Sequence, residues 1–360
     1  MYVECVSVKG FRNLAPLSLT LSAGLNLFFG NNAQGKTNFL EAIYICSTGR
    51  SQRTNTDREM IGYSETDAFV QAFVRTEQNR YDKIDIHLHR SNKKGIAVNG
   101  LPIKKLGQLF GNLLTVIFSP EDLQLIKAGP SERRRFMDIE LCQLSAIYYH
   151  ELQQYYRVLK QRNNLLKSIR TTARLRDTVA IWDDQLVDHG IRVISHRQVF
   201  IDELSRLAQR AHTRLTNGCE QLTLVYRPSV AQDDFSQRLA QVLERDIALG
   251  STSVGIHKDD VIFRINDEDV RIFGSQGQQR TAALAAKLAE VELMRQRKQT
   301  YPVLLLDDVL SELDEHRQNC LIKSIESIQT IMTSTNADIR LPTTALYSVE
   351  NGMVKKSYLK

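Results

Sequence analysis

The sequence predicts an α/β fold with an inserted α-helical arm, and three observations carry this prediction. A glycine-containing loop at 30–37 lies between a strand-like run and a helix-like run. A second apolar strand, at 303–306, ends in two aspartates. Between these two segments, residues 131–214 contain no proline and a single glycine, as long helices do.

The loop and the carboxylate strand must meet in space if they serve one site, although they lie far apart in the chain. Residues 1–125 and 250–360 are therefore expected to form one discontinuous domain, and 126–249 to form the inserted helical arm. Alternating apolar and polar residues predict strands in the first part, with a hairpin turn at Asn99-Gly100. The predicted strands are 2–8, 17–21 and 84–89.

The loop matches the phosphate-loop pattern, in which two glycines stand five residues apart and Lys-Thr follows. Glycines let backbone N–H groups turn inward around phosphate oxygens, and the following helix N-terminus favours an anion. Lys36 is expected to neutralise the β- and γ-phosphates, and Thr37 to offer its hydroxyl to Mg²⁺. The nucleotide-binding residues predicted here are Gly30, Asn31, Asn32, Ala33, Gln34, Gly35, Lys36, Thr37 and Asn38.

The strand that ends at Asp307 has the continuous apolar run of a buried parallel strand. Asp307 is expected to hold Mg²⁺ through water, and Asp308 to orient an attacking water. The sequence therefore predicts one Mg-ATP site, with Thr37 and Asp307 as metal residues. Lys36 and Asp308 are its catalytic candidates.

A second anion site is indicated at 274–280, which reads Gly-Ser-Gln-Gly-Gln-Gln-Arg. Ser275 is a good N-cap, and Gln278 at the third helical position completes a capping box. The same residues would cap any helix, so a plain helix start is the alternative. The order of the segments, with Ser-Glu-Leu-Asp at 311–314, resembles ABC-type ATPases. The resemblance implies that Ser275, Gly277 and Gln278 reach the nucleotide of a second subunit.

Within that superfamily the whole chain resembles the RecF family, bacterial recombination-mediator ATPases with an SMC-like head. The resemblance rests on the phosphate loop and on 10–14, 48–53, 118–123, 129–136 and 305–314. It implies ATP and Mg²⁺ as cofactors, and DNA (duplex and single-strand/duplex junctions), RecR and an ATP-dependent homodimer as partners. It also places Arg12 and Asn13 near the base and ribose, with core packing as an equal alternative for Phe11.

Two positions depart from what the superfamily leads one to expect. The catalytic carboxylate is commonly Glu, and Asp308 is one methylene shorter, so slow ATP turnover suited to a switch is expected. The histidine that senses the γ-phosphate should follow the strand at 329–333, but Ser334-Thr335-Asn336 stands there. Thr335 or Asn336 is the expected substitute.

Composition agrees with a globular cytoplasmic protein. Hydrophobic residues make up 42% and charged residues 24% of the 360 positions. No apolar run reaches the length of a membrane span, and no cleavable signal pattern is found, so no membrane association is expected. The cysteines are odd in number and lack metal-ligand spacing, which favours free thiols in a reducing compartment. The net charge of +6 permits an anionic partner.

The predicted arm is the preferred DNA-binding element. Apolar residues recur in it at helical spacing, among them Ile147, Tyr155, Leu159, Ile181 and Leu186. It is too short for the coiled coil of an SMC protein, which needs many more heptads. A solvated polar face is the better reading for any single basic residue. The candidates for phosphate contact are Arg133, Arg134, Lys160, Arg162, Lys167, Arg170, Arg174 and Arg176.

Other classes of function fit less well. An SMC-like structural DNA tether needs a longer arm, and a transporter ATPase subunit needs a shorter interval between phosphate loop and signature. A metabolic kinase leaves the signature and 311–314 unexplained. His257, beside Asp259 and Asp260, offers too few ligands for zinc and is interpreted as an ordering element near the signature helix.

Overall fold

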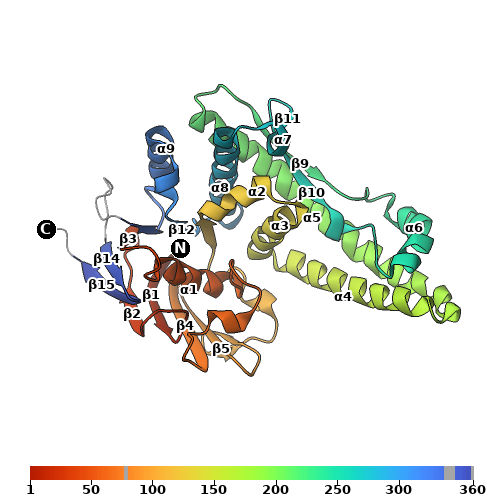
Figure 1. Ribbon diagram of the computed structural model, residues 1–360, viewed down its shortest axis with the longest axis horizontal. Helices are drawn as coiled ribbons and strands as arrows, with labels where there is room; N and C mark the ends of the chain where they lie inside the picture. The colour runs from red at the N-terminus through yellow and green to blue at the C-terminus, as the bar shows by residue number, and fades with distance from the viewer. Residues whose placement is uncertain (77–79, 336–344, 358–360) are drawn as a thin grey trace.

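Two six-stranded sheets and a long helical arm make up most of the molecule (Figure 1). The computed structural model describes residues 1–76, 80–335 and 345–357. Within these residues no helix combines the length and the apolar character that a membrane span requires.

The first sheet contains the two strands that the sequence predicts to carry the site. Its order is β15-β14-β3-β13-β12-β8, and its strands run parallel except for β15, which is antiparallel to β14. All five residues of β12 are buried, as its continuous apolar run predicts. The strands are β3 (Leu25–Phe29), β8 (Thr115–Phe118), β12 (Val303–Asp307), β13 (Thr330–Ser334), β14 (Ala345–Glu350) and β15 (Met353–Ser357).

The second sheet is antiparallel, in the order β2-β1-β4-β5-β6-β7. The predicted N-terminal strands and the hairpin at Asn99-Gly100 are confirmed. Helix α1 (Lys36–Thr48) contacts strands of both sheets and is buried on nearly every side, because apolar residues fill its centre from Phe39 to Cys46 except for Glu41. The strands are β1 (Tyr2–Lys9), β2 (Leu17–Thr20), β4 (Asp67–Arg75), β5 (Tyr81–His89), β6 (Gly95–Val98) and β7 (Leu101–Pro102).

The arm consists of two antiparallel helices, α4 and α5, that project from the sheets, and α6 packs along their outer part (Figure 1). A short 3₁₀ turn joins the two helices at the tip, as predicted. The segments are α3 (Pro130–Leu144), α4 (Ala146–Ile169), η4 (Ala173–Thr178), α5 (Val179–Leu215) and α6 (Phe235–Leu249).

The remaining elements connect the arm to the sheets. A three-stranded antiparallel sheet has the order β11-β10-β9, and α8 packs along α5. These elements are β9 (Leu222–Arg227), η5 (Ile256–Lys258), β10 (Asp260–Ile265), β11 (Glu268–Asp269), α7 (Val270–Phe273) and α8 (Gln276–Lys298). The short segments elsewhere are η1 (Asp57–Met60), η2 (Leu106–Gln108), η3 (Pro120–Leu123), α2 (Gln124–Lys127), η6 (Val309–Glu312) and α9 (Glu315–Ile325).

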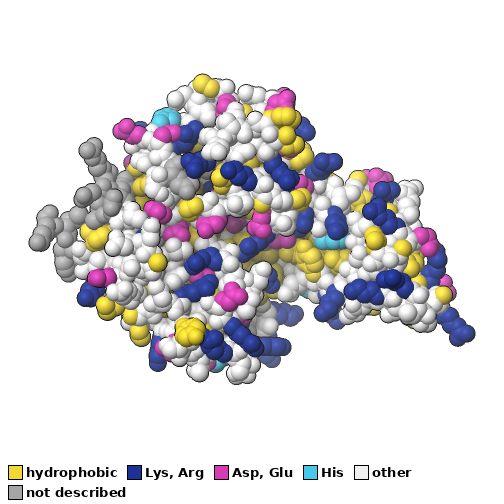
Figure 2. All heavy atoms as spheres, in the orientation of Figure 1, with side chains coloured by type: hydrophobic (Ala, Val, Ile, Leu, Met, Phe, Trp, Pro, Cys, Tyr) yellow, Lys and Arg dark blue, Asp and Glu magenta, His cyan; other side chains and the backbone are white. Residues whose placement is uncertain are grey.

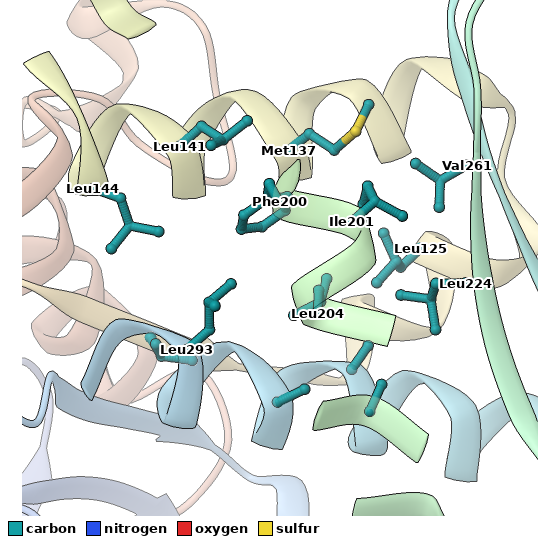
Figure 3. Packing of buried hydrophobic residues seen from close by; sticks show 14 of the residues in the cluster. Leu125, Met137, Leu141, Leu144, Phe200, Ile201, Leu204, Leu224, Val261 and Leu293 are labelled. Carbon is teal, nitrogen blue, oxygen red and sulfur yellow. The ribbon is translucent and has the colours of Figure 1, made fainter. Parts of the chain in front are cut away.

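One hydrophobic core runs through the base of the arm and across the proposed domain boundary. Figure 3 shows side chains of α3, α5 and α8 pointing toward one another, labelled Met137, Leu141, Phe200, Ile201, Leu204 and Leu293. Strand β9 lies inside 126–249, whereas its partner β10 lies outside. The division into 1–125 with 250–360 and 126–249 therefore stays a prediction about chain order, since packing and pairing join the two parts.

A buried arginine holds the base of the arm together. Arg197 of α5 is fully buried, and its Nη1 donates to Asp259 Oδ2 and to the Ile256 carbonyl, each at 2.8 Å. Its Nη2 donates to Asp138 Oδ1 at 2.8 Å, and its Nε to the Tyr148 hydroxyl at 3.1 Å. Two carboxylates compensate this buried charge, so α3, α4, α5 and η5 share one polar network.

His257 belongs to the same base, and its hydrogen-bond partners come from the arm and its flank rather than from the signature helix. Its Nδ1 lies 2.9 Å from the Tyr155 hydroxyl and its Nε2 lies 3.0 Å from the Thr252 carbonyl. A carbonyl can only accept, so Nε2 carries the proton and Nδ1 accepts from Tyr155. Burial lowers the pKa of His257 to about 4.

We expect His257 to make the fold acid-sensitive. Its pKa is lower in the folded chain than in the unfolded chain, so the unfolded state binds the additional proton. Stability from this group is therefore complete above pH ~6.5 and is lost as the pH falls toward ~4, by at most roughly 3 kcal/mol. Urea unfolding of wild type and His257→Gln across this range measures the difference. Parallel pH curves for the two proteins would contradict the assignment.

Candidate functional site

The glycine-containing loop begins directly after β3 and ends where α1 starts. Gly30 and Gly35 have φ angles of +154° and +108°, which side chains rarely adopt. A Cβ on Gly30 would lie 2.3 Å from the Val349 carbonyl oxygen, and a Cβ on Gly35 would lie 2.8 Å from Asn13 Oδ1. Both positions therefore require glycine, as the phosphate-loop pattern demands.

Lys36 is the first residue of α1, and its side chain folds back over the loop. Its Nζ donates to the carbonyl of Gly30 at 2.5 Å and to that of Asn31 at 2.9 Å. Burial lowers the pKa of Lys36, while the charges of Asp308 and Asp307 act in the opposite direction. The ammonium is thus held at the mouth of the loop, where a phosphate would meet it.

Asp307 and Thr37 meet as the sequence predicts. The Thr37 hydroxyl donates to Asp307 Oδ1 at 2.9 Å, and the Thr333 hydroxyl of β13 donates to the same oxygen at 2.7 Å. Burial raises the pKa of Asp307, and these two hydrogen bonds oppose the rise. A hydroxyl beside a carboxylate is an oxygen-donor set of the kind that Mg²⁺ prefers, so the residues present fit this ion.

Asp308 lies just beyond the end of β12 in a left-handed conformation, with φ of +51°. Its backbone N–H donates to the Thr333 hydroxyl at 3.0 Å, which holds this unusual backbone in place. Positive φ at a non-glycine residue is uncommon and gathers at functional sites. The side chain of Asp308 lines the same cavity as Lys36.

A cavity of about 1050 Å³ joins these groups. Predicted residues that line it are Arg12, Asn13, Asn32, Ala33, Gln34, Gly35, Lys36, Thr37, Asn38, Asp307 and Asp308. Gly30 and Asn31, at the start of the loop, do not line the cavity and contact Lys36 through their carbonyls. The volume and the mixture of backbone, cationic and carboxylate groups suit a nucleotide with its phosphates.

Arg12 lines the cavity, but its charge is already paired. Its Nε and Nη2 donate to the two oxygens of the buried Glu41 at 2.9 and 2.7 Å. Its Nη1 donates to the Glu59 carbonyl at 2.6 Å. Arg12 therefore shapes the cavity wall from a fixed position, and the neighbouring Phe11 is fully buried in the core, as its alternative interpretation had it.

Sequence reasoning missed part of the cavity lining. Arg53 and Glu121 lie in segments that were noted only for the family resemblance. Arg58, Ile61, Tyr63 and Arg90 follow no motif and lie outside the strands. The isolated bridge between Phe11 and Ile61 and the Arg90 hydrogen bonds to the carbonyls of Gly62 and Tyr63 hold their segments together. The missed residues are Arg53, Arg58, Glu59, Ile61, Tyr63, Arg90, Pro120, Glu121 and Thr333.

The predicted signature does not line this cavity. Ser275 is the N-cap of α8, and the capping box is confirmed: the Gln278 N–H donates to Ser275 Oγ at 3.2 Å, and the Ser275 N–H donates to Gln278 Oε1 at 2.8 Å. Ser275 and Gly277 are exposed. The two helix starts predicted to bind anions therefore do not share one cavity.

The basic residues proposed for DNA fall into two groups. Lys167, Arg170, Arg174 and Arg176 are exposed at the tip of the arm, and Figure 2 shows Lys and Arg side chains gathered there. Arg176 is paired with Glu244. Arg134 is half-buried and donates to the Asp259 carbonyl at 2.7 Å. Lys160 is exposed on α4.

Two of these candidates are structural. Arg133 is buried and donates to both oxygens of Asp260, at 2.6 and 3.1 Å. Arg162 is fully buried, and its guanidinium donates to Asp183 at 2.5 Å and to Asp246 at 2.8 Å. Each guanidinium is occupied by a carboxylate inside the protein, so neither is available to DNA phosphates. The prediction was wrong for these two residues.

Comparisons place these features in a family. The chain matches the model of the RecF/RecN/SMC N terminal domain over residues 2–355. "DNA replication and repair protein RecF" of Lachnoclostridium phytofermentans is 48% identical over 360 residues, covering 99% of this chain and 100% of the relative. The protein of the same name from Clostridium botulinum strain Loch Maree is 42% identical over 367 residues, covering 99% and 100%.

Solved structures agree. The recombination mediator protein RecF with ATP, of the RecFOR pathway, has 36% identity and a TM-score of 0.94, covering 99% of this chain and 98% of that chain. The Smc head domain of Pyrococcus furiosus, solved with a bound ScpA domain, has 15% identity and a TM-score of 0.58, covering 100% and 96%. This second likeness concerns the fold alone.

Proposed function

Because the chain belongs to the RecF family and has its SMC-like, ABC-type ATPase head fold, we propose that it is an ATP-dependent DNA-binding protein of recombinational repair and replication restart. Its relatives are named for DNA replication and repair, and a solved relative is a recombination mediator with bound ATP. In this proposal the protein is cytoplasmic, acts with RecR and promotes recombinase loading on DNA.

One observation carries the proposal: the phosphate-loop cavity and the capping box at Ser275, the two predicted halves of a nucleotide site, do not meet within one chain. The phosphate loop, Asp307 and Asp308 share one cavity, whereas the capping box at Ser275 stands exposed elsewhere. A second copy can supply its helix start to the open cavity, and two-fold symmetry then completes two sites at once. ATP would thus stabilise a homodimer, since a ligand held between subunits favours their association.

Mg-ATP would be held by the residues that already cluster. Lys36 would neutralise phosphate charge, and Thr37 and Asp307 would hold Mg²⁺, which supplies compensation for charge on the phosphates. Asp308 would orient water. The short carboxylate side chain at this position supports slow hydrolysis, which would act as a switch that loosens the dimer and releases DNA.

The arm is the proposed DNA contact. In a dimer the two arms would form a clamp around duplex or around single-strand/duplex junctions. Exposed cations without stacking aromatic residues favour phosphate contact, which makes binding depend on salt. Arg134, Lys160, Lys167, Arg170, Arg174 and Arg176 remain the candidates, with Arg133 and Arg162 removed.

Removing the tip cations should weaken DNA binding. The logarithm of the DNA-binding constant falls linearly with the logarithm of salt concentration. We expect Lys167→Ala/Arg170→Ala/Arg174→Ala to make this fall shallower, by about one unit of slope for each residue that contacts a phosphate. Fluorescence anisotropy with labelled duplex over a salt series measures this slope. The control, Lys93→Ala/Lys355→Ala/Lys356→Ala, removes three exposed charges, one from the loop between β5 and β6 and two from β15. Equal slopes for the two triple variants would show that the tip of the arm does not contact DNA phosphates.

Sedimentation velocity tests the central claim. Wild type is expected to dimerise with Mg-ATP and to stay monomeric with Mg-ADP. Ser275→Arg should bind ATP as a monomer and fail to dimerise, because the bulky arginine side chain blocks the exposed helix start. Ser251→Arg, at an exposed serine after α6, should dimerise like wild type. A wild-type monomer with every nucleotide would refute the shared site.

The alternative is an SMC-like structural DNA tether or another ABC-type ATPase subunit. The likeness to the Smc head supports the head fold of such a tether. However, α4 has 24 residues and is therefore only about 36 Å long. An arm of this length suits a clamp on one duplex better than a bridge between two distant ones.

A further inference from the structure

The outer face of the antiparallel sheet carries a cluster of side chains that could ligate a metal, and none of them lines the phosphate-loop cavity. Asp67 opens β4, and His87 and His89 close β5. The register pairs Asp67 with His89 and Phe69 with His87. Because alternate residues of a strand point to one face, Asp67, His87 and His89 all project from the same side of the sheet.

Their ligand atoms already lie together. One oxygen or nitrogen from each of Asp67, His87 and His89 lies within 4.8 Å of the other two. His89 Nδ1 is 2.5 Å from Asp67 Oδ1, and the two imidazole rings have centroids 4.3 Å apart. Thr66 holds the second oxygen of Asp67 with a hydrogen bond of 2.9 Å.

We propose that Asp67, His87 and His89 form a binding site for a zinc-class divalent transition-metal ion. Two imidazoles and one carboxylate are the ligands of many zinc sites, with bonds of about 2.0–2.2 Å. Two ligands on a tetrahedral ion stand about 3.4 Å apart by this geometry, so the Asp67–His89 contact opens by less than ~1 Å. The hard ions Mg²⁺ and Ca²⁺ prefer all-oxygen sites and are disfavoured here.

The scaffold is suited to hold an ion. The ligands come from two hydrogen-bonded strands rather than from loops, so their spacing is set by the sheet. A surface ion pair would need only Asp67 and His89. Among the described residues His87 has no hydrogen-bond partner, and its ring contacts Phe69 and His89. As the third ligand of a metal ion, His87 would gain a polar partner that the protein itself does not provide.

The site also has an open side and a defined neighbour. Asp67 and His89 side chains are 48% and 27% exposed, so water or an external group can complete the coordination of an ion held by three protein ligands. Arg90 follows His89 directly and donates to the carbonyls of Glu65 and Gly62 at 2.6 and 2.8 Å. An ion at this site would link the ends of β4 and β5. The site would lie next to Arg90, which together with Tyr63 lines the nucleotide cavity.

Metal titration tests the site without any nucleotide. The background is Cys320→Ser, because Cys320 Sγ lies 3.8 Å from His316 Nε2 and offers a competing pair. Competition with a chromophoric zinc chelator should show one zinc per chain. Co²⁺ should give visible d–d bands without the charge-transfer band of a thiolate.

Matched variants decide the assignment. Asp67→Ala, His87→Ala and His89→Ala should each raise the zinc Kd by at least ~10-fold, whereas His150→Ala, at an exposed histidine on α4, should leave it unchanged. Circular dichroism confirms that the variants remain folded. Wild-type affinity in any of the three ligand variants, or no stoichiometric zinc in the background protein, would overturn the site.

Discussion

Lys36→Arg is expected to lower ATP turnover by on the order of 10²–10³-fold, as the loss of one positioned charge-stabilising group does in other enzymes. Nucleotide binding should persist at reduced affinity, because the cation remains. The reason is geometric: Nζ sits between the carbonyls of Gly30 and Asn31 at 2.5 and 2.9 Å, and a planar guanidinium cannot occupy that compact position. Phosphate release and titration with a fluorescent ATP analogue measure the two effects.

Lys127→Arg is the matched control for this change. Lys127 is exposed on the short helix α2, and the same substitution there should leave turnover and binding as in wild type. Unchanged turnover in Lys36→Arg would mean that the ammonium does not act on the phosphates. Loss of binding together with turnover would show that Lys36 serves binding more than chemistry.

Arg197→Met should lower the free energy of unfolding by about 3–5 kcal/mol, the usual cost of breaking a buried ion pair by removing one partner. Asp259 is fully buried and would lose its compensating cation without Arg197, and Asp138 would lose the same partner. The single tryptophan, Trp182, lies on α5 and packs against the same core. Its fluorescence during urea unfolding therefore reports on the arm.

Arg192→Met on the same helix provides the comparison. Arg192 is 53% exposed; it contacts the buried Glu151, which also contacts His189, and it pairs at the surface with the exposed Asp188. An exposed pair of this kind is worth less than about 1 kcal/mol. Equal destabilisation by the two substitutions would show that the buried network at the base of the arm contributes no more than a surface contact.

The sequence was sufficient for the chemistry that depends on neighbouring residues. The phosphate loop, the buried carboxylate strand and the capping box at Ser275 each follow from a short pattern, and each lies where its pattern predicts. Helical spacing likewise identified Tyr155, Leu159 and Leu186 as buried. Ile147 and Ile181 share that spacing but are 68% and 59% exposed, because they lie where no other element covers the helix.

Features that depend on long-range pairing could not be derived. The sequence around a basic residue on a helix does not show whether a distant carboxylate pairs with it in the folded structure. For this reason Arg133 and Arg162 were assigned to DNA. Asp260, the partner of Arg133, and Asp246, one of two partners of Arg162, come from segments about 80–130 residues later in the chain. The expected sensor at Thr335 or Asn336 stays a prediction, and Asn336 lies outside the described residues.

The position of β3 in its sheet has a consequence for synthesis on the ribosome. Its neighbours are β13 and β14, which come from the last part of the chain, about 300 residues after β3. The antiparallel sheet needs only residues up to Pro102, so it can form early. The phosphate loop, in contrast, follows a strand that has no partner until translation is nearly complete. A nascent chain stalled before β13 should therefore be unable to retain ATP, whatever time it is given to fold.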